Sequence, residues 1–237
     1  MTLSVFIAST LAIITGSIVQ VLTGVGGGFI AVPILAWLDL SLVPAPLVFA
    51  SMSLSGTMMI REWHAIDWLH IPAILAGLIP GAVAGAWVLA AIPSDRLGII
   101  FGVVLILGIL LTVSGRKLSL THISGALVGS LCGAMGASTG MGAPPLALLY
   151  QHHSGATIRA TLAALYTGAS LMILIILFGF GKFGVTETLT GLYLVPGYVI
   201  GYLLARRKLF QFGDQHARAA VLVVSGATAI ALIYRSL

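Results

Sequence analysis

Two glycine clusters are the residues of this sequence best suited to bind a ligand. They read TGVGGGFIAVP at residues 23–33 and ASTGMGAPPLA at residues 137–147, and each interrupts an apolar stretch. A helix that restarts after such a break presents unpaired N–H groups and the positive end of its dipole, which together suit an anion. Glycine also lets a ligand approach the backbone closely. We therefore expect an anion cradle formed by Gly24, Gly26, Gly27 and Gly28 on one side and by Ser138, Thr139, Gly140 and Gly142 on the other.

Hydroxyl side chains near these clusters extend the expected site. Thr23 begins the first cluster, Ser51 lies in the apolar segment that follows it, and Thr161 lies in the corresponding segment of the second half. These hydroxyls have an alternative role, because in membrane helices they also bond to backbone carbonyls or across helices. The glycines have one too, since small residues let helices pack closely. We expect that packing role for two proline–glycine segments, LIPGAVAG at 78–85 and LVPGYVIG at 194–201.

The composition places these clusters in a membrane. Of 237 residues, 59% are hydrophobic and 7% are charged, whereas soluble domains carry about 25% charged residues. The N-terminal residues 1–24 lack the basic start and the A-x-A-like site of a signal peptide, so we interpret them as the first membrane segment. A single cysteine, Cys132, excludes an internal disulfide and a multi-cysteine metal site, and is expected to be a buried apolar side chain.

The apolar blocks repeat in order along the chain. They cover 3–38, 42–60, 69–92, 97–114, 122–150, 157–180, 188–205 and 217–234, and the first and fifth contain the glycine breaks. The two proline–glycine segments match at five of eight positions and start 116 residues apart, while Gly16-Ser17 and Gly129-Ser130 are 113 apart. Repeated halves with interrupted segments in matching places are typical of secondary transporters. We predict one membrane repeat at residues 1–118 and a second at 119–237, which together form a single transporter domain.

The distribution of basic residues favours inverted repeats. If each broken block crosses straight through, Lys and Arg divide five against six between the two sides. If each is a hairpin that returns to its starting side, the division is eight against three, as expected of a cytoplasmic face. The hairpin model places the loops at 115–121 and 206–216 in the cytoplasm and both termini outside. The predicted fold is thus an all-α integral membrane protein of two inverted repeats, each a glycine-broken helical hairpin followed by three transmembrane helices.

No group of residues indicates an enzyme, a metal site or a bound cofactor. Hydrolysis would need a Ser/His pair, a metal cluster or paired carboxylates inside the membrane, and no spacing supplies them. The net charge of +5 comes from scattered loop Lys and Arg, so it is interpreted as a topology signal and nucleic-acid binding is not expected. Glu62 is expected in a solvated loop cluster with Arg61 and His64. His152-His153 and Arg159 are expected to be loop residues or interfacial anchors at the cytoplasmic face, with attraction of an anion as the alternative role of Arg159.

The sequence resembles the TauE/SafE family of membrane transporters over essentially its whole length. The resemblance rests on GSIVQVLTGVGGGFIAVPIL at 16–35, VFASMSLSGT at 48–57 and AIDWLHIPAILAGLIPGAVAGA at 65–86. The first cluster is close to the G-x-G-G-G-x-x-x-x-P pattern of that family, whereas the second cluster departs from it. The resemblance implies a transporter of anionic sulfur compounds such as sulfite and sulfoacetate, mostly by export and in some members by uptake.

These observations combine into one expected function. We expect a secondary transporter of small anions, and of sulfur oxyanions or organosulfonates in particular. It would export its substrate by alternating access, with the hairpin tips meeting near the midplane of the bilayer. An anion channel, or an importer of another small anion, is the alternative. The expected location is the inner membrane of a bacterial cell, as a multi-pass protein surrounded by lipid. Coupling to H⁺ or Na⁺ and the oligomeric state stay open, a homodimer being one alternative.

Overall fold

The structure is a computed structural model that describes residues 3–93, 96–114, 118–150, 154–207, 226–228, 230–231 and 234. Within these residues it is entirely helical and contains no β-strand. The α-helices are α1 (Leu3–Thr23), α2 (Gly27–Leu38), α3 (Ala45–Arg61), α4 (Ile71–Ala91), α5 (Leu97–Ser114), α6 (His122–Thr139), α7 (Ala143–Tyr150), α8 (Gly155–Gly179) and α9 (Val185–Arg206). Two short 3-10 turns, η1 (Leu40–Leu42) and η2 (Trp63–Ala65), precede and follow α3. Several predicted features lie outside the described residues: most of the block at 217–234, His152-His153, and residues 115–117 and 208–216.

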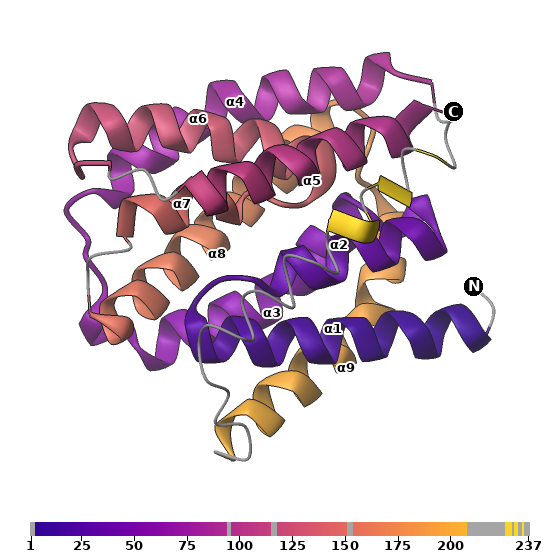
Figure 1. Ribbon diagram of the computed structural model, residues 1–237, viewed down its shortest axis with the longest axis horizontal. Coiled ribbons are helices and arrows are strands. Elements are labelled where there is room, and N and C mark those ends of the chain that lie inside the picture. The colour runs from indigo at the N-terminus through magenta and orange to yellow at the C-terminus, as the bar shows by residue number, and fades with distance from the viewer. Residues whose placement is uncertain are drawn as a thin grey trace.

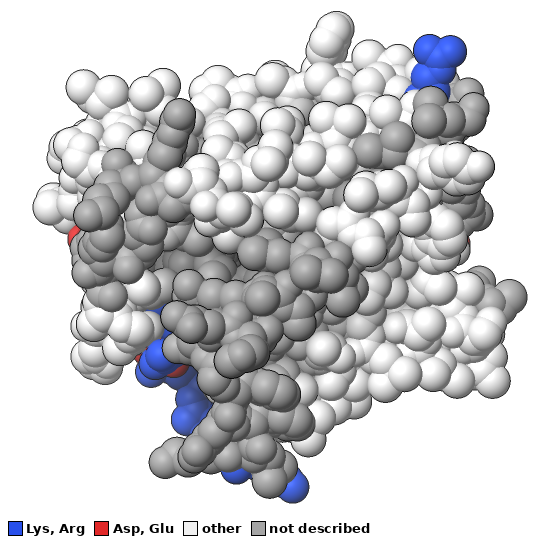
Figure 2. All heavy atoms as spheres, viewed as in Figure 1, with Lys and Arg blue, Asp and Glu red and all other residues white. Residues whose placement is uncertain are grey.

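The helices have the length and surface of a membrane protein. Five of them, α1, α4, α5, α8 and α9, are long and apolar enough to cross a bilayer. Large apolar side chains such as Leu107, Ile175 and Leu203 are exposed along them, where lipid rather than water is the suitable solvent. Figure 2 shows the described Lys, Arg, Asp and Glu side chains of the visible face at its upper right, left and lower left, while the other described residues there are uncharged. The chain is a multi-pass membrane protein, which confirms this part of the predicted fold.

Both predicted breaks are present, and at each the chain turns back on itself. Gly24 and Gly26 have positive φ angles of 82° and 102° between α1 and α2, and Gly140 has a φ of 82° between α6 and α7. A Cβ atom built on Gly16 of α1 would lie 2.8 Å from the carbonyl oxygen of Gly27, so α2 begins alongside α1. In the second break, a Cβ atom on Gly142 would lie 2.7 Å from the Cys132 carbonyl oxygen of α6. Two shorter helices therefore return beside the longer ones that precede them (Figure 1).

The prolines of the two breaks do not occupy equivalent places. The sequence predicts that Pro33, Pro144 and Pro145 lie near the first turn of a restarting helix, where proline costs least. Pro144 and Pro145 do lie in the first turn of α7. For Pro33 the prediction is wrong, because α2 begins directly at Gly27 and Pro33 lies inside the helix. An interior proline removes one helical hydrogen bond.

Close glycine contacts join the two halves of the chain. Helix α4 packs along α6, and α1 packs along α9. A side chain on Gly81 or Gly85 would run into the backbone of α6 at Ser130 or Ala134. On the other side, a Cβ atom on Gly201 would lie 2.5 Å from Ser17 Cβ. The packing role expected for the two proline–glycine segments is confirmed.

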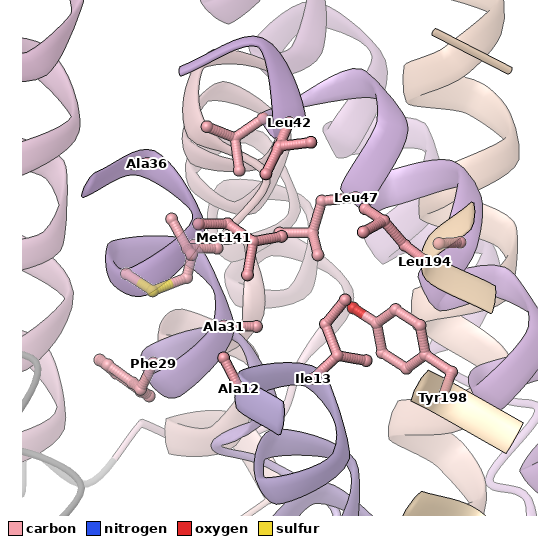
Figure 3. Close-up of a cluster of buried hydrophobic side chains, with 14 of the residues drawn as sticks. Ala12, Ile13, Phe29, Ala31, Ala36, Leu42, Leu47, Met141, Leu194 and Tyr198 are labelled. Atoms are coloured by element: carbon pink, nitrogen blue, oxygen red, sulfur yellow. The ribbon is translucent and has the colours of Figure 1, made fainter. Parts of the chain in front are cut away.

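A buried apolar cluster lies between the first hairpin, α3 and α9. It includes Ile13 of α1, Phe29 of α2, Leu47 of α3 and Tyr198 of α9, together with Met141 of the second break. Figure 3 shows the Tyr198 ring extending from α9, with its hydroxyl directed towards the interior of the cluster near Ile13. Helices α3 and α8 pack against each other, and the space beside them forms the cavity described next.

Candidate ligand-binding cavity

A small cavity opens among helices of both halves. Its volume is about 80 Å³, which is room for several water molecules, since one needs roughly 10–15 Å³ by the same measure. Its polar lining comes from Gln20 of α1, Ser51 and Ser55 of α3, Tyr166 and Ser170 of α8, and Tyr198 of α9. The remaining lining consists of glycines and apolar residues, including Cys132 of α6. A ligand of this size is a small ion or a compact organic anion.

The two glycine breaks come together at this cavity. Gly28, in the first turn of α2, and the segment Gly140–Ala143 both line it. A Cβ atom built on Gly28 would lie 3.4 Å from Met141 Cγ and meet nothing else within 4 Å. The N-terminal ends of α2 and α7 thus border the same space, and neither first turn contains an acidic residue.

The residues predicted for the site divide into two groups. Those that line the cavity are Gly28, Ser51, Gly140 and Gly142. Those that do not are Thr23, Gly24, Gly26, Gly27, Ser138, Thr139 and Thr161. The glycines of the second group have structural roles: Gly24 and Gly26 adopt positive φ angles. A side chain on Gly27 would run into the side chain of Gln20.

The predicted hydroxyl groups are mostly engaged within the protein. Ser138 and Thr139 donate to the carbonyls of Ala134 and Met135 in their own helix, each at 2.7 Å. The Thr161 hydroxyl accepts a hydrogen bond from the Asp67 backbone N–H at 2.9 Å. Ser51 lines the cavity while donating to the Val48 carbonyl at 2.8 Å. The alternative role of such hydroxyls, bonding to the backbone, accounts for these contacts.

Four polar groups that line the cavity have no hydrogen-bond partner among the described residues. They are the Gln20 amide and the hydroxyls of Tyr166, Ser170 and Tyr198. Ser170 is 8% exposed and Tyr198 is 5% exposed, and the Tyr166 hydroxyl oxygen is buried. Buried polar groups in proteins nearly always have a partner, which can be water or a ligand. These four groups are therefore available to bind a molecule in the cavity.

Sequence reasoning missed all four of these groups, although the sequence contained a signal for some. Gln20 is an uncharged polar residue inside the first apolar block, three residues before the first cluster. Tyr166 and Tyr198 lie within apolar blocks, away from the interfaces where membrane tyrosines usually gather. Ser170 carried no such signal, because serine is common in membrane helices.

The electrostatics of the cavity come from the backbone. Among the described residues, none that lines it carries a charged side chain. The first N–H groups of a helix have no partner inside the helix, and its N-terminus carries about half a positive charge. The α2 terminus offers such N–H groups at the cavity, and α7 offers fewer because Pro144 and Pro145 in its first turn have no N–H. The partial positive charge at these two termini favours an anion over a cation.

One end of the first hairpin lies beside an ion pair that joins the two halves. A Cβ atom on Gly24 would lie 3.2 Å from Arg159 Cα at the start of α8. Arg159 Nε lies 3.4 Å from both carboxylate oxygens of Glu62, just after α3. Glu62 is therefore paired across the halves, a contact that the expected loop cluster with Arg61 and His64 did not include. Arg159 is thus an ion-pair partner, a role not predicted from the sequence.

A metal centre finds no support in the described part of the chain. No group of three or more His, Cys, Asp or Glu side chains gathers there. Asp67 and His70 form a pair, with 3.0 Å between Oδ2 and Nδ1, and the His70 ring lies near that of His122. Cys132 is buried as expected, and it also borders the cavity.

The helical bundle with five helices able to span a bilayer defines a multi-pass membrane protein, and it contains a small cavity with several polar side chains in its lining. Comparison with known families then specifies the chain further. It matches the family described as sulfite exporter TauE/SafE over residues 9–232, and it belongs to that family. Members of this family are transporters, so the chain is a transporter of an anionic substrate and not an enzyme. No curated protein and no solved structure matches the chain.

Proposed function

We propose that the protein carries one small sulfur oxyanion or organosulfonate at a time through this cavity, in the direction of export. The observation that carries the proposal is the cavity itself, where both glycine breaks and four unpartnered polar groups meet. The backbone N–H groups at the start of α2 and the Ala143 N–H at the start of α7 would attract the anion. The neutral side chains would replace its hydration shell. Of the residues predicted from sequence, Gly28, Gly140, Gly142 and Ser51 belong to this site. The predicted residues that do not line the cavity would hold the backbone around it in place without touching the anion: Thr23, Gly24, Gly26, Gly27, Ser138, Thr139 and Thr161.

The proposed mechanism is alternating access between two inverted repeats, residues 1–118 and 119–237. Two features of the packing support it. In the proposed repeats α1 corresponds to α6, α3 to α8 and α4 to α9. Exchanging the halves therefore turns the α1–α9 contact into the α4–α6 contact and leaves the α3–α8 contact as it is. The Glu62–Arg159 pair brings the end of α3 beside the start of α8, so these two equivalent helices run in opposite directions. Inverted halves that rock about a shared site are the usual basis of such transport.

The proposed orientation has Arg61, Arg159 and Arg206 at the cytoplasmic face and Arg96 and Lys182 outside, in the inner membrane of a bacterium. Coupling to H⁺ or Na⁺ would appear as loss of concentrative transport when an ionophore collapses the gradient of that ion. A homodimer would appear as a doubled protein mass in detergent.

Counterflow in proteoliposomes tests the proposal. Vesicles containing the purified protein and preloaded with unlabelled sulfite should take up labelled sulfite faster than empty vesicles, because a carrier exchanges substrate. Gly28→Val should abolish this exchange, since its side chain would enter the cavity without meeting backbone. Flux without stimulation by internal substrate would indicate a channel instead. An absence of flux for sulfite, thiosulfate and sulfoacetate would refute the proposal.

A further inference from the structure

The described side chains that line the cavity add no net charge to it. Among the described residues that line it there is no Lys, Arg, Asp, Glu or His. The Arg159 guanidinium near Gly24 is paired with the Glu62 carboxylate at 3.4 Å, so this pair adds no net charge. The positive potential that remains comes from the helix ends.

Two helix N-termini supply at most about one positive charge in total. Helix α2 has 12 residues and α7 has eight, and both begin at the cavity. A complete N-terminus is equivalent to roughly half a positive charge. The α7 terminus supplies less, because Pro144 and Pro145 have no N–H and the C-terminal end of α6 meets the same cavity at Gly140. Neither helix has an acidic side chain in its first turn to cancel it.

The unpartnered side chains are a second feature of the cavity, besides the helix ends, that suits a ligand. Ser170 and Tyr198 are more than nine-tenths buried, border the cavity and have no hydrogen-bond partner among the described residues. The Gln20 amide and the Tyr166 hydroxyl are in the same position. All four groups can donate a hydrogen bond while remaining neutral. They can stabilise an anion without raising the charge of the site.

We infer that this site selects anions with a single negative charge over dianions of the same shape. The inference rests on the proposed function and narrows its substrate class. The two helix ends offset at most the whole charge of a monoanion such as hydrogen sulfite or an alkylsulfonate. A dianion such as sulfate would leave at least one negative charge uncompensated in a region of low dielectric, where such a charge is costly.

Methanesulfonate and sulfate form a suitable pair of probes, because a methyl group replaces one oxygen and one charge while the tetrahedral shape is kept. Their affinities would be measured with the purified full chain in detergent, by titration calorimetry at constant ionic strength. We expect methanesulfonate to bind about tenfold more tightly than sulfate, or more. The affinity for sulfite should also fall as the pH rises and hydrogen sulfite loses its proton.

Substitution of Gln20 tests the electrostatic reason for the preference. Gln20→Lys adds one positive charge to the lining, so it should shift the ratio of affinities towards sulfate by about tenfold or more. The neutral control Gln20→Met removes the donor without adding charge, so it should weaken both anions and keep the preference. The parent protein and Gln20→Met suffice for the test if the lysine variant does not fold.

The outcomes separate this inference from the proposed function. Equal affinities in the parent, or tighter binding of sulfate, would overturn the preference for monoanions and leave the anion site standing. A ratio unchanged by a folded Gln20→Lys variant would also overturn it, because charge would then not set the selectivity. Binding of neither anion, nor of sulfite, would overturn the proposed function and this inference with it.

Discussion

Replacing Tyr198 by phenylalanine is the most direct test of the candidate site. The substitution removes one hydroxyl from the cavity lining and keeps the ring, which packs in the apolar cluster of Figure 3. The hydroxyl has no partner among the described residues, so no hydrogen bond within the described protein is lost. We therefore expect the thermal stability of the ligand-free protein to be unchanged or slightly higher.

The affinity for the anion should change in the opposite direction. A hydrogen bond to a charged group contributes about 1.5–3 kcal/mol, and each 1.4 kcal/mol corresponds to about a tenfold change in Kd. Loss of the Tyr198 hydroxyl should therefore raise the Kd for a bound anion roughly 10- to 150-fold. Tyr166→Phe should act in the same way, because its hydroxyl oxygen is also buried without a partner.

The assay combines calorimetric titration with thermal unfolding of the same detergent-purified samples. Tyr193→Phe is the matched control, since Tyr193 lies on the same helix α9, is 63% exposed and does not line the cavity. It should leave both the Kd and the unfolding temperature unchanged. A Tyr198→Phe protein that unfolds at a lower temperature and binds the anion like the parent would refute the reasoning, because the hydroxyl would then serve the fold.

Three further outcomes are expected. Gly85→Val should lower the free energy of unfolding by about 1–3 kcal/mol, as overpacking does, because its side chain would run into α6; unfolding measurements in detergent check this, and equal stability would contradict the packing. Ser138→Ala should leave the anion Kd unchanged, since that hydroxyl donates within its own helix; a weaker affinity in titration would return Ser138 to the site. With Cys132 replaced by alanine, a cysteine at Lys182 should react with an impermeant thiol reagent in intact cells and one at Arg207 should not; the reverse pattern would reject the proposed orientation.

The large features of the fold could be predicted from the sequence because the membrane constrains them strongly. A chain with 7% charged residues must cover its surface with lipid. Glycine clusters inside apolar blocks mark places where the helix ends, and both breaks occur where predicted, at Gly24–Gly26 and at Gly140. Local backbone preferences sufficed for these features.

The composition of the cavity could not be predicted in the same way. Whether a glycine lines a cavity or permits close packing depends on the helix that lies opposite. Gly27 and Gly28 are neighbours in one motif, yet Gly27 contacts the Gln20 side chain and Gly28 borders the cavity. The same holds for hydroxyls: Thr139 bonds to its own helix, whereas Ser170 lines the cavity. Such differences arise from tertiary packing, and no spacing within the sequence contains them.

A lining of neutral groups suits the needs of a carrier better than charged side chains would. Fixed cations bind an anion tightly, but the same attraction opposes its release on the far side of the membrane, and transport needs both steps. Helix ends and hydroxyls provide a weaker attraction that depends on geometry. If the halves rock, the ends of α2 and α7 belong to different halves and would move relative to each other, so the attraction would change during the cycle. The glycine breaks would then do more than admit the anion: by placing one helix end in each half, they would couple the strength of binding to the motion that releases it.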